Sequence, residues 1–271
     1  MNPTMTDSKD SLVRLSILLP VRNEGINLKI MLKILRAVLE IPHEVLVICD
    51  SPDDTSIPVV EAMHQEYANL RLVQNNAGRG VIKAIRAGVD AASGEYILIF
   101  AADEVGPVLA IEDMLHLIDE GCDFVSCTRY AHGGRRLGGS LLGQILSRIA
   151  NRLFHLLSGC ALTDATTGIK LMRRSVYYQL NLEAQPVGWA VAFEMSMKAQ
   201  LGNFKMGEVP IISIDRLYGG ASTFRPGPWT LEYLKWFIWG SIRLRSKTNR
   251  KPEVLVRKSP SSTPLAAKVT K

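Results

Sequence analysis

The chain has 271 residues, of which 47% are hydrophobic and 21% are charged. This length suffices for one large α/β domain or two small ones, and this composition excludes an intrinsically disordered protein. The net charge of +6 is concentrated at the C-terminus, because residues 243–271 hold nine Lys or Arg and one acid, a net charge of +8. The rest of the chain carries about −2, so we expect no binding to nucleic acid.

The N-terminus is polar and lacks the apolar segment of a signal peptide, and no run of about 18 apolar residues predicts a transmembrane helix. The four cysteines show no metal-binding spacing, so we expect reduced thiols in the core of a cytoplasmic protein. The basic C-terminal segment suits an anionic membrane surface, and a solvated tail without function is the alternative. We therefore expect a cytoplasmic protein that lies peripherally on the cytoplasmic face of a membrane.

Apolar runs and helical spacings alternate through the first hundred residues. In chain order they predict strand 15–20, helix 27–40, strand 44–49, helix 57–68, strand 70–74, helix 80–92 and strand 96–101. Strands that are nearly continuous apolar runs and alternate with helices are typical of a parallel sheet covered on both faces. In such a sheet, ligands bind at the carboxyl ends of the strands.

Two amphipathic stretches follow, at 140–158 and 229–242. The second holds three of the four tryptophans and directly precedes the basic segment, which is typical of a helix in a membrane interface. An ordinary core helix is the alternative. We therefore divide the chain into a main domain at 12–228, an amphipathic interfacial helix at 229–246 and a basic, disordered tail at 247–271.

Three predicted strands end in loops that are rich in polar and acidic residues. These loops hold Pro20, Arg22, Asn23 and Glu24 after the first strand, Asp50, Asp53 and Asp54 after the second, and Ala102, Asp103 and Glu104 after strand 96–101. Carboxylates gathered at one sheet edge repel each other unless a cation or a hydrogen-bonding ligand joins them. A solvated turn explains any single loop, but three converging loops favour a binding site for a diphosphate with a divalent metal, or for a sugar.

Eight short motifs follow one another between residues 15 and 235. They are Pro20-Val-Arg-Asn-Glu24, Asp50-Ser-Pro-Asp-Asp-Thr55, Asn75-Asn-Ala-Gly78-Arg-Gly80, Ala101-Ala-Asp103, Thr128-Arg129-Tyr130, Asp164-Ala-Thr-Thr-Gly-Ile-Lys170, Phe193-Glu194 with Lys198, and Asp215-Arg216 with Ser222. In this order they resemble the motifs of family 2 glycosyltransferases with the GT-A nucleotide-sugar fold, in the polyprenyl (dolichyl) phosphate mannosyltransferase-like branch.

The resemblance implies an α/β fold of the GT-A type, with a mixed, mostly parallel sheet flanked by helices. It implies an inverting transfer of a hexose, mannose first, from a nucleotide diphosphate sugar to a polyprenyl phosphate or another lipid-linked acceptor. GDP-mannose is the leading donor and UDP-glucose the second. It also implies Mg²⁺ or Mn²⁺ at Asp103 and Glu104. Ala101 stands where the family carries the first aspartate of its metal motif, which leaves Asp103 as the main ligand.

The resemblance also assigns roles to individual residues. Substrate binding falls to Pro20, Arg22, Asn23, Glu24, Asp50, Asp53, Gly78, Lys83, Ala102, Lys170 and Ser222, and catalysis to Asp103, Glu194, Arg129 and Arg216. A lipid phosphate needs no strong base, and Arg129, Arg216 and Lys170 would position it. A hydroxyl acceptor requires a base, for which Glu194 is the candidate. A helix-surface pair of Glu194 with Lys198 is the alternative for this carboxylate.

Three other functions compete with this one. A nucleotidyltransferase shares the sheet and the acidic edge, but it would carry a glycine-rich loop with Arg and Lys where this chain has residues 20–24. A glycosyltransferase of cell-surface polysaccharide synthesis would use a glycan hydroxyl as acceptor. A catalytically degenerate scaffold that binds nucleotide sugars is a third candidate, because of Ala101.

Overall fold

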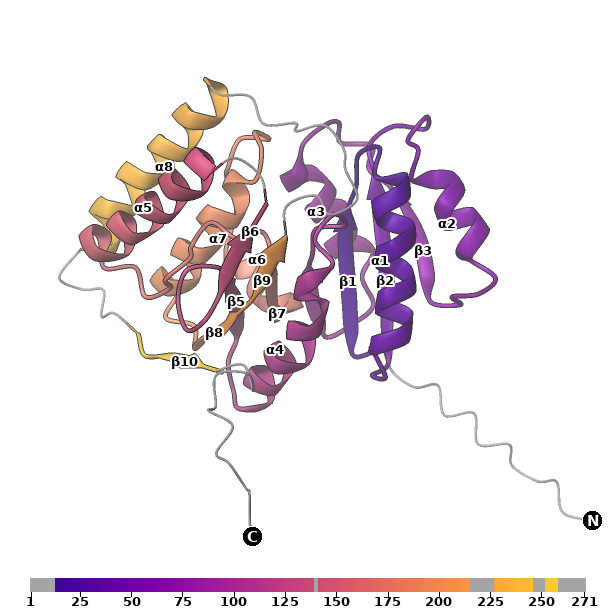
Figure 1. Cartoon of the computed structure of the whole chain (residues 1–271), viewed down its shortest axis with the longest axis horizontal. Helices are drawn as coiled ribbons and strands as arrows, with labels where there is room; N and C mark the ends of the chain where they lie inside the picture. Colours follow the sequence, from indigo (N-terminus) through magenta and orange to yellow (C-terminus); the bar gives the residue numbers. More distant parts are fainter. Residues whose placement is uncertain (1–12, 139–140, 215–226, 246–251, 258–271) are drawn as a thin grey trace, which may run out of the picture.

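The structure is a computed structural model that describes residues 13–138, 141–214, 227–245 and 252–257 (Figure 1). The central sheet contains β1 (Leu15–Pro20), β2 (His43–Cys49), β3 (Leu70–Gln74), β4 (Tyr96–Ile99), β5 (Phe124–Thr128), β7 (Lys170–Arg173), β8 (Met206–Pro210) and β10 (Val254–Val256). A second sheet pairs β6 (Arg135–Leu137) with β9 (Ile212–Ile214). The helices are α1 (Gly25–Val38), α2 (Ile57–Met63), α3 (Val81–Ala91), α4 (Ala110–Asp119), α5 (Leu141–Ser158), α6 (Arg174–Gln179), α7 (Ala190–Leu201) and α8 (Pro228–Leu244), with a 3₁₀ turn η1 (Gly106–Leu109).

The central sheet has the strand order β10-β8-β5-β7-β4-β1-β2-β3. Only β7 runs antiparallel to its neighbours, β4 and β5, among the strands that the structure describes. The carboxyl ends of β1, β2, β4, β5 and β8 therefore share one edge of the sheet, and β7 begins at that same edge. This arrangement confirms the expected mixed, mostly parallel sheet.

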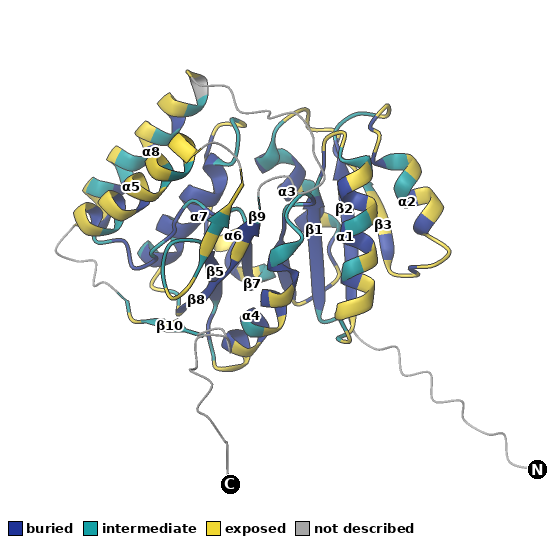
Figure 2. Cartoon of the chain, viewed as in Figure 1, coloured by how far each residue is buried: buried dark blue, intermediate teal, exposed yellow. Residues whose placement is uncertain are grey.

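Helices cover both faces of the sheet (Figure 1). Side chains of α1, α2 and α4 pack into one core cluster, and those of α3, α6 and α7 pack into another. Strand β1 contributes to both clusters in alternation, since Ile17 and Leu19 join the first and Leu18 joins the second. Burial on both faces explains why β1, β2 and β4 are almost continuous apolar runs. Figure 2 shows β1 and β2 in the colour of buried residues, whereas the edge strands β3 and β10 are partly exposed.

The four cysteines are all buried in the core, as the sequence predicted, and none of them forms a disulfide. The two amphipathic stretches are helices, α5 and α8, as the sequence predicted. They pack against each other, and α8 also packs against α7, so that both lie at the outer end of the molecule (Figure 1).

Part of the predicted disordered tail is instead a strand. β10 lies at the edge of the sheet and pairs in parallel with β8, Val254 opposite Met206. The side chain of Arg257 then reaches α4, with its Nε 3.0 Å from Asp113 and its Nη1 3.2 Å from Glu120. The prediction of disorder is therefore wrong for this segment, because the Val-Leu-Val run completes a sheet edge. Residues 247–251 and 258–271 of the predicted tail lie outside the described residues.

Candidate active site

The loops after β1 and β2 are tied together by hydrogen bonds. The backbone N–H of Asn23 donates to Asp54 (3.0 Å), and that of Thr55 donates to the side-chain oxygen of Asn23 (3.3 Å). The N–H of Glu24 donates to the hydroxyl of Ser56 (3.1 Å). Asn23 has a φ of 57°, a left-handed conformation that asparagine tolerates better than most residues. The two loops therefore form one fixed platform at the edge of the sheet.

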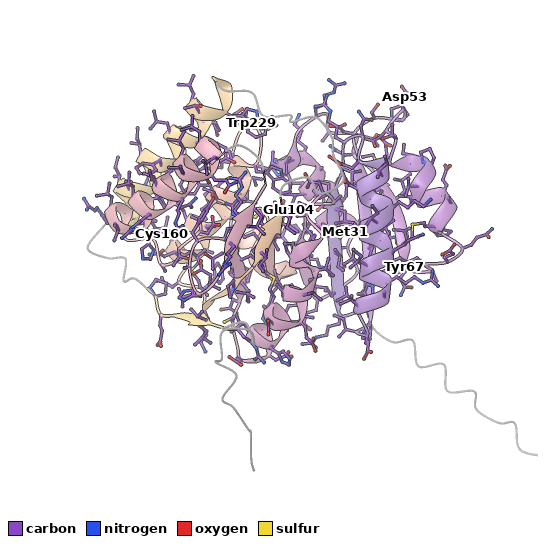
Figure 3. The ribbon with its side chains drawn as sticks, viewed as in Figure 1. Met31, Asp53, Tyr67, Glu104, Cys160 and Trp229 are labelled. Atoms are coloured by element: carbon purple, nitrogen blue, oxygen red, sulfur yellow. The ribbon has the colours of Figure 1, made fainter. Side chains whose placement is uncertain are left out.

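The platform carries the predicted donor-binding residues of both loops. Arg22 and Asp53 are exposed, and Pro20 and Asp50 are partly buried. Asp53 is labelled near the top of the molecule in Figure 3. Asp54 differs from these residues, because it is buried and its carboxylate accepts hydrogen bonds from the platform itself. The structure thus brings these four predicted residues to one edge and leaves two of their charges open to a ligand.

The turn before α3 contributes the next part of the site. The side chain of Asn75 bridges the turn, donating to Gly78 O (2.9 Å) and accepting from the N–H of Ala77 (3.0 Å). Gly78 has a φ of +89°, and a Cβ added there would lie 3.4 Å from Nζ of Lys83. The Lys83 ammonium therefore lies over the turn, beside the N-terminus of α3. A cation beside a helix N-terminus is suited to bind the phosphates of a nucleotide.

The loop after β4 holds the two candidate metal ligands. Asp103 and Glu104 are partly buried, and Ala102 beside them is 3% exposed. Figure 3 labels Glu104 in the middle of the molecule, between its two halves. No group of three or more His, Cys, Asp or Glu that could hold a metal occurs among the described residues. A magnesium ion in a phosphate site typically uses one or two carboxylates, with substrate phosphates and waters, and the pair here fits that pattern.

Arg129 lies directly after β5 and is fixed by a buried carboxylate. Its Nε and Nη2 donate to the two oxygens of Asp164, at 2.7 and 3.0 Å, and its side chain is 12% exposed. Burial alone would lower the pKa of Arg129, but the Asp164 carboxylate outweighs burial and raises it. Burial would likewise raise the pKa of Asp164, and Arg129 outweighs it and lowers that pKa. The pair is therefore ionised, and it presents a fixed cation at the shared edge of the sheet.

The Arg129–Asp164 pair is connected to α5. Nη2 of Arg129 also donates to the hydroxyl of Thr166 (3.1 Å), and that hydroxyl accepts from Nδ2 of Asn151 (2.9 Å). This contact explains why the polar Asn151 is one of the residues that α5 buries.

Lys170 does not reach the surface of the site. Its side chain is completely buried, and its ammonium donates to Ser126 (2.7 Å) and Ser196 (2.8 Å). Burial lowers the pKa of Lys170 to about 8. The residue opens β7, which is inserted between β4 and β5, so its side chain lies inside the molecule. This placement corrects the prediction that Lys170 binds substrate.

Glu194 is also completely buried. Its two oxygens accept the N–H groups of Glu183 (2.6 Å) and Ala184 (2.8 Å), and Nζ of Lys198 lies 2.8 Å away. The pairing with Lys198 is thus present, although inside the protein and not on a helix surface. A carboxylate occupied in this way cannot reach an acceptor hydroxyl, which corrects its prediction as a catalytic base.

Two predicted residues, Arg216 and Ser222, lie outside the described residues. Two further residues, Asp164 and Glu208, have contacts in this region to which no sequence pattern assigned a role. Asp164 stands in a recognised motif, but its pairing with Arg129 joins residues 35 positions apart. Glu208 is an acid within the apolar strand Met206–Pro210, and a lone acid in such a strand signals a buried carboxylate that needs partners.

The sequence of the chain is similar to those of known glycosyltransferases. A model of the family described as "Glycosyl transferase family 2" matches residues 16–180. The polyprenol monophosphomannose synthase of Mycolicibacterium smegmatis is 25% identical over 210 residues, which cover 76% of this chain and 79% of that protein. The dolichol-phosphate mannosyltransferase of Pyrococcus furiosus is 23% identical over 226 residues, 82% of this chain. The match spans 62% of the Pyrococcus protein, less than two thirds of its length.

Solved structures of glucosyl-3-phosphoglycerate synthase from Mycobacterium tuberculosis share the fold. One was determined with Mn²⁺, UDP and glucosyl-3-phosphoglycerate; it has a TM-score of 0.64 and 14% identity, covering 84% of this chain and 80% of that one. Another was determined with Mg²⁺ and UDP and has a TM-score of 0.61 and 17% identity, covering 84% and 79%. At these identities the likeness shows the fold alone, and it confirms the predicted GT-A architecture.

Proposed function

The chain belongs to glycosyl transferase family 2, and from this premise we propose that it transfers mannose, with inversion, from a nucleotide diphosphate sugar to a polyprenyl phosphate. The observation that carries the acceptor half of this proposal is the fixed, ionised Arg129 at the edge of the sheet. The names of the Mycolicibacterium and Pyrococcus relatives support the same acceptor and sugar. Membership of this family also argues against the nucleotidyltransferase alternative.

A phosphate acceptor fits the buried state of Glu194 better than a hydroxyl acceptor does. A hydroxyl needs a base within hydrogen-bond reach, whereas both oxygens of Glu194 are engaged by backbone N–H groups in the interior. A phosphate monoester is already anionic near neutral pH, so it needs a cation to orient it and no base. Arg129 is suited to this role, because a planar guanidinium binds phosphate oxygens in a defined orientation.

On the donor side, the platform of Arg22, Asn23 and Asp53 would hold the nucleoside. Lys83 and the N-terminus of α3 would hold its diphosphate. Asp103 and Glu104 would hold the Mg²⁺ or Mn²⁺, which supplies positive charge against the departing diphosphate. In the transfer, an acceptor phosphate oxygen forms a bond to C1 of the sugar while the bond from C1 to the β-phosphate oxygen breaks.

We also propose that α5 and α8 rest on a membrane, where the lipid acceptor lies. Both helices leave large apolar side chains 46–71% exposed. We call this surface the apolar face; it consists of Leu141, Leu142, Ile145, Leu146, Ile149, Leu153, Leu156 and Leu157 on α5, and Leu231, Leu234, Ile238 and Ile242 on α8. Figure 2 shows α5 mostly in the colour of exposed residues. Contiguous exposed apolar side chains on a soluble surface mark a site of contact with a partner or a membrane.

Charge on the same helices favours a membrane as the partner. Arg148 and Arg152 are exposed on α5, and Lys235 and Arg243 are exposed on α8. Apolar side chains next to cations are typical of helices that lie in the interface of an anionic bilayer. None of the helices within the described ranges is long and apolar enough to cross a membrane. The proposed contact is therefore peripheral.

A donor and acceptor panel tests the proposed function. The purified chain is incubated with radiolabelled GDP-mannose or UDP-glucose, with Mn²⁺, Mg²⁺ or a chelator, and with vesicles that contain polyprenyl phosphate or polyprenol. We expect mannose transfer to polyprenyl phosphate alone, lost with the chelator. Transfer to polyprenol or to an added oligosaccharide would instead support a hydroxyl acceptor. No transfer, but thermal stabilisation by a nucleoside diphosphate, would instead support the degenerate scaffold that binds nucleotide sugars. Neither transfer nor stabilisation would overturn the proposed function.

A further inference from the structure

The carboxylate of Glu208 is buried and holds the turn at residues 163–164, which contains Asp164, the partner of Arg129. Glu208 is 1% exposed on β8. Its Oε1 accepts the backbone N–H groups of Thr163 (2.9 Å) and Asp164 (3.3 Å), and its Oε2 accepts the hydroxyl of Thr163 (2.7 Å). A buried carboxylate with three donors fixes the local backbone, because moving any donor away would leave the carboxylate unsatisfied.

One arm of this contact leads to the backbone after Arg129 through two hydroxyls. Oγ1 of Thr163 lies 2.8 Å from Oγ1 of Thr128, which in turn accepts the N–H of Tyr130 (3.3 Å). Because Thr163 gives its only hydroxyl proton to Glu208, Thr128 must give its proton to Thr163. The ionised carboxylate thus sets the direction of the two hydroxyl hydrogen bonds, from Thr128 to Thr163 and from Thr163 to Glu208.

The other arm leads to the guanidinium of Arg129. Glu208 holds the N–H of Asp164, and both carboxylate oxygens of Asp164 bind Arg129. The two arms therefore fix the segment from both sides. We propose that Glu208 is a positioning residue for the transfer reaction, which holds Arg129 in the orientation that receives the acceptor phosphate. This inference rests on the proposed function.

The surroundings of Glu208 make its charge sensitive to pH. The titratable and charged residues around it are Cys127 on β5, His132 after β5, Asp164, and Lys170 on β7. Arg257, after β10, bonds only to the backbone of Glu208, and its guanidinium contacts Asp113 and Glu120. His132 is the nearest cation-forming group, with Nε2 3.7 Å from Oε2. Burial, with Asp164 adding to it, raises the pKa of Glu208 to about 7, against the hydrogen bonds from Thr163 and Asp164. A proton on Oε2 would be donated to Thr163 and would reverse the chain of hydroxyls.

Glu208→Gln tests this role, because its amide imitates the protonated acid. The carbonyl oxygen of the glutamine can still accept both N–H groups, while its NH₂ donates to Thr163. We expect the wild-type to variant ratio of kcat/KM for polyprenyl phosphate to be near one at pH 6. This ratio should rise to about tenfold at pH 8, which is the size of loss typical when a residue that orients a ligand-binding group is replaced. Taking the ratio cancels the ionisation of the acceptor phosphate, and KM for the donor should not change.

Two comparisons separate positioning from general stability. Glu44→Gln also alters a carboxylate that is buried and bound by three donor side chains, of Ser16, Arg71 and Ser93, far from Arg129. Its ratio to wild type should not vary with pH. The second comparison tests the same hydrogen bond at its other end, and it applies even if Glu208→Gln does not fold. Thr163→Val lacks the hydroxyl that bonds to Glu208 and should lose activity, whereas Thr163→Ser keeps the hydroxyl and should remain active.

A wild-type to Glu208→Gln ratio that stays flat between pH 6 and 8 overturns the inference, and so does full activity of Thr163→Val. A wild type that transfers no sugar at any pH counts against the proposed function and not against the positioning role. If no protein transfers sugar, amide hydrogen exchange of the wild type and the two variants tests the positioning role, since this measurement needs no substrate. Faster exchange at Arg129 and Tyr130 in Glu208→Gln, with Glu44→Gln unchanged there, supports the inference, and unchanged exchange overturns it.

Discussion

In the half of the sheet built on β1–β3, the charged side chains of the candidate site lie on loop tips, and Arg22 and Asp53 are exposed. In the half built on β5, β7 and β8, Arg129 is mostly buried, and Lys170 and Glu208 are almost completely so. The first half can offer its charges to a ligand at little cost to folding. The second must satisfy its charges with internal partners, so Arg129 and Glu208 serve the fold as well as the proposed site, whereas Lys170 serves the fold.

The largest effect should follow from Arg129→Ala, which breaks a buried pair. Asp164 would remain inside the protein without its cation, which costs about 3–5 kcal/mol of unfolding free energy. Transfer to polyprenyl phosphate should fall at least about 100-fold, because a fixed cation at the reacting anion is lost. Urea unfolding and acceptor kinetics measure the two losses.

Arg36→Ala provides the control for that prediction. Arg36 and Glu66 form an exposed pair (2.9 Å) with both side chains at least half exposed, so its loss should cost at most about 1 kcal/mol. If Arg129→Ala proved as stable as Arg36→Ala, the contrast between exposed and buried charges would be wrong. Arg129→Lys should keep the charge but lose activity, because lysine cannot make the two parallel contacts to Asp164.

A second prediction concerns the apolar face, which only the second half of the molecule carries. Replacing Leu146 and Ile149 of α5, 56% and 49% exposed, by aspartate should weaken partitioning to anionic vesicles about 100-fold, since each apolar side chain buried in lipid contributes about 1.5 kcal/mol or more. Co-sedimentation with vesicles measures it. Leu72→Asp, at an exposed leucine of β3, is the matched control and should bind like the wild type. Equal binding by all three proteins would exclude the apolar face as the membrane contact.

The sequence predicts the first half of the fold better than the second. Strands 15–20 and 70–74 have the predicted bounds, and α1 begins and ends within two residues of its predicted range. These elements are specified by local apolar patterns, which a single sequence displays. The insertion of β7 between β4 and β5 and the pairing of β10 with β8 depend on segments far apart in the chain. No local pattern reveals such pairings.

The same distinction explains which side chains a sequence can place at the ligand edge of the sheet. Arg22 and Asp53 follow strands directly, and loop residues after parallel strands face the ligand edge in any such sheet. Lys170 and Glu194 stand in recognised motifs, but whether their side chains face the site depends on β7 and α7 and on what covers them. The sequence does not reveal the proposed role of Glu208, because that role arises from contacts with residues about 45 positions away.

The smallest effect is expected at Lys170, whose pKa of about 8 makes stability depend on pH. The unfolded chain keeps this lysine protonated to about pH 10.4, so between the two values the unfolded state binds more protons and folding becomes more favourable as pH rises. The wild type should therefore gain about 1.5 kcal/mol over Lys170→Met between pH 8 and 9.5. Taking the difference between the two proteins cancels the cysteines, of which Cys49 and Cys122 have pKa values raised by burial to about 12 and about 11. A constant difference across this range, measured by urea unfolding, would mean that the ammonium is better solvated than its contacts with Ser126 and Ser196 imply.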